Sequence, residues 1–336
     1  MIFYFWEGDK GGGLTKKLLL IETGGTIACL PTERGYSPRS VSEIFGGFAG
    51  TLSPRDKRLF REGLHGEDPE ILPLFSLDST DLTPAHWRRL YETARDALAS
   101  RKYSGIVILH GTDTLDYTAA LLYYTLKAEI PVILTGAMTP LAEEGSDGVR
   151  NLADALLAAR DKRLKGVYVA FGGRIIQGNE AIKTRSDAAD AFRSFSGADV
   201  GRIKDGAVAL LREPSQAEIY DYPEKDRNIA VIKLSPLMTG AALVAAVSAS
   251  GADGAVLEGY GAGGLPEHLL PAARSLAEKI PVVMTSPCIG GARLGEYEVG
   301  RRALEVGIAD GGTLTTAAAA VRLYLAGVNE SVKREF

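Results

Sequence analysis

Four short stretches of the chain combine glycines with side-chain hydroxyls and carboxylates, the residue types that hold small polar molecules. They are Thr23-Gly24-Gly25-Thr26, Asp78-Ser79-Thr80-Asp81, His110-Gly111-Thr112-Asp113-Thr114 and Thr135-Gly136-Ala137-Met138-Thr139. Each stretch taken alone is also typical of a helix N-cap that follows a βα loop. Together they predict one small-molecule site with hydroxyl chemistry. A threonine hydroxyl is a weak nucleophile at neutral pH, so such a site needs a neighbouring base or a lysine whose amine is held neutral.

The glycine pair Gly24-Gly25 ends an apolar run and is followed by Thr26. Two-residue hairpin turns favour Asn, Asp or Gly, so a turn of that kind would not explain the flanking threonines. Because glycine has no side chain, its backbone can pass directly beside a ligand. We therefore expect this pair to line the site.

Metal and serine-hydrolase chemistry have weaker support. The histidines lack the paired spacing of a zinc site; they are His65, His86, His110 and His268. The sequence contains no Gly-x-Ser-x-Gly motif. His110 ends a buried strand, so we expect a satisfied structural role for it. Neither a metal nor a cofactor is predicted.

Short apolar runs that alternate with helical patterns must position these stretches. The expected strands are residues 17–23, 71–77, 105–111, 131–137 and 166–172, and later 228–236, 254–260 and 281–287. Such alternation is typical of a parallel sheet wound with helices on both faces. Ligands of these sheets bind beyond the carboxyl ends of the strands, and all four polar stretches follow strand ends. The predicted fold class is therefore α/β with a mainly parallel wound sheet.

The length of 336 residues favours two domains. The regular pattern loosens after Phe195 and resumes near residue 228. We expect a frayed extension over residues 1–16, a larger N-terminal domain with the catalytic residues over 17–205, a linker over 206–227 and a smaller α/β domain over 228–336.

Composition narrows the class of partner. A net charge of −4 and a pI near 5.7 argue against a nucleic-acid partner, which needs a clustered basic surface. Two cysteines cannot form a disulfide framework and indicate a reducing compartment. The apolar runs are too short for a signal peptide or a membrane helix. We expect a cytoplasmic protein that acts on a small molecule, with no membrane partner.

Several motifs resemble the bacterial-type L-asparaginase family, including its cytoplasmic type I members. They are "TGGTIA" (23–28), "HGTDTLDYTA" (110–119), "TGAMTP" (135–140), "SDGVRNLADA" (146–155), "AIKTRSDAADAF" (181–192) and the segment 297–323. The resemblance covers most of the chain from about Lys17. It implies hydrolysis of L-asparagine to L-aspartate and ammonia through a threonine acyl-enzyme, in a homodimer or homotetramer.

The resemblance also implies roles for individual residues. Thr26 matches the first nucleophilic threonine, and Tyr36, in a loop from Cys29 to Pro38, matches a lid tyrosine. Thr112, Asp113 and Lys183 match a second catalytic group, although a lysine in this context would otherwise be interpreted as a solvated surface charge. The residues that match the family's substrate-binding positions are Gly25, Ser79, Thr80, Asp113 and Ala137. Asp113 matches the position that faces the α-ammonium group, in addition to its match in the catalytic group. Which threonine forms the acyl-enzyme stays open.

The chain departs from common family residues at Thr139, Gly264 and Ala317. The last two lie in the C-terminal domain, which in this family contributes to a neighbouring subunit's site. The details of that shared wall are therefore open, and so is the preference between asparagine and glutamine.

Other functions fit the sequence less well. The stretch "GYGAGG" (259–264) fits a dinucleotide-binding motif, but no acidic residue follows the next strand to bind a ribose. An amidotransferase subunit that supplies ammonia to tRNA would carry an extra N-terminal domain and a more basic surface. A non-catalytic amino-acid sensor would have no chemical need for the catalytic set. A glutaminase-asparaginase of broad specificity is the main alternative.

Overall fold

The computed structural model describes residues 16–33, 35–38, 58, 68–215 and 218–326. These residues divide into two units. One holds the described residues up to 193 and from 198 to 215, and the other holds 194–197 and 218–326. The domain boundaries expected from the sequence stay a prediction, but residues 207–210, within the expected linker, form a strand of the large sheet.

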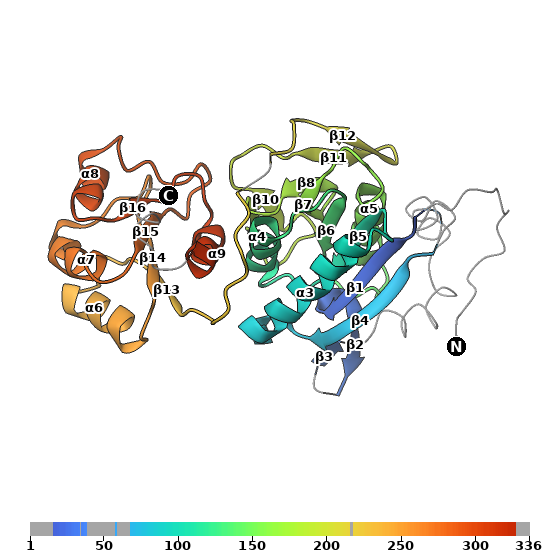
Figure 1. Ribbon diagram of the computed structural model, residues 1–336, viewed down its shortest axis with the longest axis horizontal. Helices are drawn as coiled ribbons and strands as arrows, with labels where there is room; N and C mark the ends of the chain where they lie inside the picture. Colours follow the sequence, from blue (N-terminus) through green and yellow to red (C-terminus); the bar gives the residue numbers. More distant parts are fainter. Residues whose placement is uncertain (1–15, 34, 39–57, 59–67, 216–217, 327–336) are drawn as a thin grey trace. The chain divides into compact units, whose positions relative to one another are not determined.

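The larger unit is built on an eight-stranded sheet with the order β12-β11-β8-β7-β6-β5-β1-β4 (Figure 1). Five strands pair in parallel: β1 (Leu18–Gly24), β4 (Glu70–Leu77), β5 (Gly105–Leu109), β6 (Pro131–Thr135) and β7 (Gly166–Phe171). Antiparallel pairing adds β8 (Arg174–Gln177), β11 (Gly201–Lys204) and β12 (Ala207–Leu210). The mainly parallel α/β sheet is thus confirmed. The sequence pattern did not predict β8, β11 and β12, because these strands are short and are joined through glycine-containing turns.

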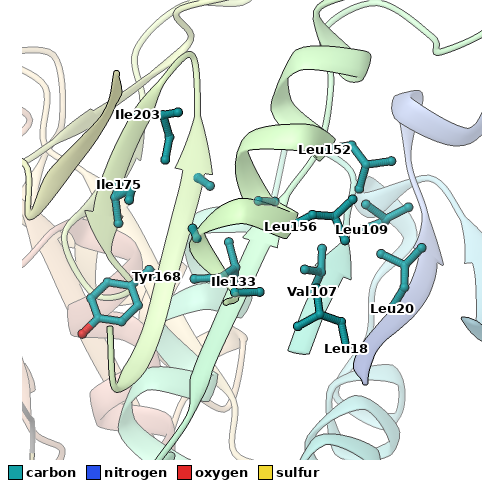
Figure 2. Close-up of a cluster of buried hydrophobic side chains, with 14 of the residues drawn as sticks. Leu18, Leu20, Val107, Leu109, Ile133, Leu152, Leu156, Tyr168, Ile175 and Ile203 are labelled. Carbon is teal, nitrogen blue, oxygen red and sulfur yellow. The ribbon is translucent and has the colours of Figure 1, made fainter. Parts of the chain in front are cut away.

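Both faces of this sheet are covered. Figure 2 shows Leu20, Leu109 and Ile133 from the strands packed with Leu152 and Leu156 of α5 (Asp147–Ala158). The strand residues that alternate with these, such as Leu19, Ile106 and Val132, are also buried, and α4 (Leu115–Thr125) packs against β6 and β7. Burial of each such side chain stabilises the fold by about 1.5 to 3 kcal/mol. The strand ends therefore stand on a rigid base.

Successive strands of the chain are placed on opposite sides of β1, with β4 on one side and β5 on the other, so the direction of the sheet's winding changes between β1 and β5. From β1 the chain reaches the edge strand β4, and α3 (Pro84–Ser100) then carries it back to β5 on the other side of β1. Ligands of open α/β sheets bind at such a switch point. The register aligns the strand ends, because Gly24 pairs with Leu77, Glu22 with Leu109, and Leu109 with Thr135.

The segment from Cys29 to Pro38 was expected to be a loop, but its described residues form an antiparallel pair of strands, β2 (Cys29–Thr32) and β3 (Gly35–Pro38). The Thr32 hydroxyl donates to the Gly35 carbonyl over 2.5 Å. The pair follows the 3-10 turn η1 (Thr26–Ala28). No strand was expected here because prolines are disfavoured in strands.

The smaller unit has a four-stranded parallel sheet in the order β13-β14-β15-β16. Its strands are β13 (Ile229–Lys233), β14 (Gly254–Glu258), β15 (Val282–Thr285) and β16 (Ala309–Asp310), and its helices are α6 (Gly240–Ala249), α7 (Leu270–Ala277), α8 (Glu298–Glu305) and α9 (Thr316–Ala326). Between β14 and β15 the chain forms the short 3-10 helix η3 (Glu267–Leu269) and then α7, with Pro271 in the first turn of α7. The second α/β domain is confirmed. None of the helices that the structure describes has the length and apolar character needed to span a bilayer.

The two cysteines differ in reactivity. Cys29 is buried, and this burial, with a smaller contribution from the charge of Asp78, raises the pKa of its thiol to about 11. Cys288 is exposed. Because the thiolate is the reactive form, we expect a disulfide reagent such as DTNB to titrate one thiol per native chain and two in denaturant. Cys288→Ser should abolish the native reaction, and rapid labelling of Cys29 in the folded protein would contradict the assignment.

Candidate functional site

All four polar stretches meet through glycines, the fourth through Gly136, where a Cβ atom would lie 2.4 Å from the His110 carbonyl oxygen. Gly24 and Gly25 have φ values of 97° and 80°, which L side chains rarely adopt. A Cβ atom on Gly24 would overlap the backbone of Leu77, and one on Gly25 would overlap the backbone of Gly111. A Cβ atom on Gly111 would in turn lie 2.6 Å from the Ser79 Oγ. The glycines are thus required by the close packing of adjacent strand ends, and their expected contact with a ligand stays a prediction.

Lys183 joins the third stretch from a distant part of the chain. It ends β9 (Ala181–Lys183), which packs against α4. Its Nζ atom donates to the Thr112 Oγ1 over 2.8 Å and to the Asp113 Oδ1 over 2.6 Å. The Lys183 side chain is 18% exposed, whereas Asp113 is 53% exposed. The structure thus brings Lys183 together with Thr112 and Asp113, the two residues grouped with it in the sequence analysis, and its amine links the Thr112 hydroxyl to the Asp113 carboxylate.

Thr26 lies beside this group. It is the first residue of η1 and is half-buried. Thr26 follows Gly25, and Thr112 follows Gly111, so the two threonines stand on neighbouring strand ends whose glycine backbones are in contact. Tyr36 belongs to β3, where its backbone pairs with Pro31. The side chain of Tyr36 lies outside the part of the chain that the structure describes.

Ser79 presents a buried hydroxyl without a partner. It begins η2 (Ser79–Asp81) and is only 3% exposed, and its Oγ atom has no hydrogen-bond partner among the described residues. The Thr114 hydroxyl donates to the Ser79 carbonyl over 2.9 Å and so ties this turn to the loop after β5. A buried polar atom without a partner costs about 1 to 3 kcal/mol. An unpartnered Ser79 hydroxyl among other hydroxyls indicates a place where a ligand would supply the missing hydrogen bond.

The loop after β6 carries Ala137, which is fully buried. Asp147 accepts hydrogen bonds from the backbone N–H groups of Met138 and Thr139 at 2.9 to 3.1 Å. Asn151 donates to the Gly136 carbonyl and to Asp147, both over 3.0 Å. Neither Asp147 nor Asn151 was predicted from the sequence to have a role. Their i, i+4 spacing at the start of a helix was the available signal, because it places both side chains on one face.

Asp116 was also missed. It lies in the first turn of α4, and burial raises the pKa of its carboxyl group to about 6. The Tyr117 backbone N–H and the charge of Lys183 oppose this rise, while the charge of Asp113 adds to it. Asp116 is therefore a second carboxyl group within the electrostatic reach of Lys183.

His110 has the structural role expected for it. Its side chain is fully buried, with Nδ1 2.7 Å from the Gly111 carbonyl and Nε2 2.9 Å from the Thr118 hydroxyl. Trp87 donates to the same hydroxyl over 3.0 Å. Burial lowers the pKa of His110 to about 4, so the imidazole is neutral at physiological pH.

The lowered pKa of His110 predicts acid sensitivity. The unfolded chain binds this proton below about pH 6.5, but the folded protein binds it only below about pH 4, so stability is lost as the pH falls through that interval. We expect the unfolding free energy to drop by about 2 to 3 kcal/mol more in the wild type than in His110→Gln between pH 7 and pH 4.5. Urea titrations at the two pH values measure this difference.

Two carboxyl groups act in the opposite direction over the same interval. Burial raises the pKa of Asp116 and of Asp154 to about 6, so these groups favour the folded state as the pH falls. Both remain in the variant, and the difference between the two proteins therefore isolates His110. An equal loss in the two proteins would contradict the assignment.

No group of three or more His, Cys, Asp or Glu side chains in the described part of the chain is arranged to hold a metal ion. The smaller unit has a cavity of about 410 Å³ whose lining includes Tyr260, Gly264, Cys288 and Arg293. It lacks the combination of threonines, lysine and carboxylates found at the edge of the large sheet. We therefore place the candidate site at that edge.

Comparison with protein families gives two matches that together cover most of the chain. The model described as "Asparaginase, N-terminal" matches residues 17–216, and the model described as "Glutaminase/Asparaginase C-terminal domain" matches residues 228–335.

Individual relatives agree with these matches. An L-asparaginase of Thermococcus kodakarensis is 39% identical over 318 residues, which are 92% of each chain. The solved thermostable L-asparaginase from that organism has a TM-score of 0.82 and 36% identity, and the match covers 95% of this chain and 96% of that one. A probable cytoplasmic L-asparaginase from Campylobacter jejuni has a TM-score of 0.77 and 26% identity, over 93% and 95% of the two chains. A glutamyl-tRNA(Gln) amidotransferase component from Methanobrevibacter smithii is 29% identical, over 92% of this chain and 71% of that protein.

Proposed function

The chain belongs to the asparaginase family, and on that basis we propose that it hydrolyses the side-chain amide of L-asparagine to L-aspartate and ammonia. One observation carries the proposal: the Lys183 amine contacts the hydroxyl of Thr112 and the carboxylate of Asp113 at the switch point of the sheet. A lysine that bridges a hydroxyl and a carboxylate can move a proton between them, which is what amide hydrolysis requires of a base.

The proposed reaction has two steps. Thr26 attacks the amide carbon, the C–N bond breaks, and ammonia leaves with the proton that the attacking hydroxyl releases. Water then attacks the resulting ester; one of its protons is relayed through Thr112 and Lys183 to the Thr26 oxygen as the ester C–O bond breaks, which releases L-aspartate and restores the Thr26 hydroxyl. Asp113 holds the Lys183 amine in place for both transfers. These steps need neither a metal nor a cofactor, so a chelator should leave activity unchanged.

The remaining residues seat the substrate. Ser79, with its unpartnered hydroxyl, is the proposed donor to the α-carboxylate, and Asp113 is the proposed anion for the α-ammonium. Thr80 and the Gly25 backbone complete that end, and the Ala137 carbonyl faces the scissile amide. Main-chain N–H groups with Thr112 would stabilise the oxyanion, and each such donor is worth about 3 to 4 kcal/mol. Tyr36 is the proposed cover for Thr26.

We further propose a cytoplasmic homodimer or homotetramer. The likeness to a probable cytoplasmic L-asparaginase from Campylobacter jejuni supports the compartment. The free cysteines Cys29 and Cys288 support it too, since disulfides are rare in reducing compartments. Broad glutaminase-asparaginase activity is the alternative function, and a comparison of L-asparagine with L-glutamine as substrates distinguishes it from the proposed one.

Substrate length provides that comparison. Glutamine is one methylene longer, and pockets separate such pairs by about 1 to 3 kcal/mol. Because Ser79, Thr80 and Asp113 fix the α-carbon end, the extra carbon would push the amide past Thr26. We expect asparagine to be preferred at least about tenfold in kcat/KM, measured as ammonia release from L-asparagine, L-glutamine and their D-forms. Equal or faster turnover of glutamine would instead support the glutaminase-asparaginase.

A further inference from the structure

Asp78 lies between β4 and η2 and takes no part in the catalytic group. Its Oδ1 atom accepts two hydrogen bonds from Thr80, from the backbone N–H and from the side-chain hydroxyl, each over 2.9 Å. The first of these bonds caps η2. Asp78 therefore fixes both the turn that presents Ser79 and the orientation of the Thr80 hydroxyl.

The direction of the second bond has a chemical consequence. A carboxylate accepts hydrogen bonds and donates none, whereas a hydroxyl has one proton to donate and two lone pairs. With its proton directed to Asp78, the Thr80 hydroxyl offers its lone pairs to a ligand. Ser79 is the opposite case, since its hydroxyl is buried, without a described partner, and retains its proton.

Two adjacent residues thus present an acceptor and a donor. An α-amino acid carries an α-ammonium, which donates, and an α-carboxylate, which accepts. Thr114 ties the same turn to the loop of Asp113 through its bond to the Ser79 carbonyl. The turn and that loop therefore present, side by side, groups complementary to the amino-acid end of a zwitterion.

We propose that Asp78 is a positioning residue that orients the substrate zwitterion, by making Thr80 an acceptor for the α-ammonium beside the Ser79 donor to the α-carboxylate. This inference rests on the proposed function. It places the effect of Asp78 on the binding of the α-carbon end, which is remote from the scissile amide.

Replacement of Asp78 tests the inference through the division between KM and kcat. In Asp78→Ala the Thr80 hydroxyl is released, and KM for L-asparagine should rise about tenfold while kcat stays within about twofold. Asp78→Asn keeps an oxygen acceptor in the same place and should restore KM to within about threefold of the wild type. The dissociation constant of L-aspartate, measured by calorimetry, should follow the same order.

Asp161 supplies a matched control. It accepts the backbone N–H of Arg163, two residues further on, over 3.0 Å, but it precedes β7 and so lies at the opposite edge of the sheet. Asp161→Ala should leave KM unchanged. An unchanged KM in Asp78→Ala would overturn the inference. So would a fall in kcat together with a lower melting temperature in Asp78→Ala, if Asp78→Asn recovered neither. Absence of ammonia release from the wild type would instead refute the proposed function. The calorimetry with L-aspartate would still test whether Asp78 affects binding of the α-ammonium and α-carboxylate groups.

Discussion

Lys183→Met is expected to lower kcat for L-asparagine by at least about a hundredfold, with KM changed by less than about threefold. Loss of a positioned acid or base costs about 10² to 10⁴ in rate. Lys183 donates to Thr112 and Asp113, but both proposed substrate anchors, the Ser79 hydroxyl and the Asp113 carboxylate, remain in the variant, so substrate binding should persist. Methionine has a similar length and no charge, which preserves packing of the largely buried side chain. Steady-state ammonia release measures both constants.

A surface lysine provides the control for this experiment. Lys165 forms an ion pair with Glu129 at 3.4 Å and is 54% exposed. Lys165→Met should retain wild-type turnover, because an exposed ion pair contributes little to stability. Wild-type turnover in Lys183→Met would remove the lysine from the mechanism, whatever its contacts.

Thr26→Ala is expected to lower kcat at least about a thousandfold, because it removes the atom that forms the acyl-enzyme. Residues that act as one unit are not additive, so the double variant Thr26→Ala/Lys183→Met should be no slower than the slower single variant by more than about threefold. Stopped assays with excess enzyme can measure such low rates.

Two further threonine variants make this result specific. Thr112→Ala should slow acylation, since Thr112 is also a proposed oxyanion donor, but it should slow the attack of water more, because the relay that activates water is broken. The acyl-enzyme should then accumulate, and mass spectrometry of quenched samples detects the adduct. Thr93, whose hydroxyl bonds the Arg89 carbonyl on the exposed side of α3, is the neutral control. More than a tenth of wild-type kcat in Thr26→Ala, or an adduct on Thr112, would contradict the assignment of Thr26.

The sequence predicted the part of this architecture that depends on local patterns. Apolar runs such as residues 105–109 located the parallel strands, and the rule that parallel strands share a carboxyl edge brought the polar stretches together. β5, β6 and β7 each end one or two residues earlier than expected, because the glycines and polar residues at their ends do not pair with the neighbouring strands.

Other features had no local signal. Lys183 lies 70 residues from Asp113, and no periodicity relates them, so only the family motif identified it. The pairing of β2 and β3 was missed because Pro31 lies within it. The role of Asp78 depends on the direction of a hydrogen bond, which becomes visible only when the turn is built.

The most direct test of the central claim is the product balance of the purified protein with L-asparagine. Ammonia and L-aspartate should appear in equal amounts, one of each for every asparagine consumed, in the presence of a chelator, and Lys183→Met should slow both to the same extent. Release of no ammonia by the wild type, or undiminished release by Lys183→Met, would contradict the account.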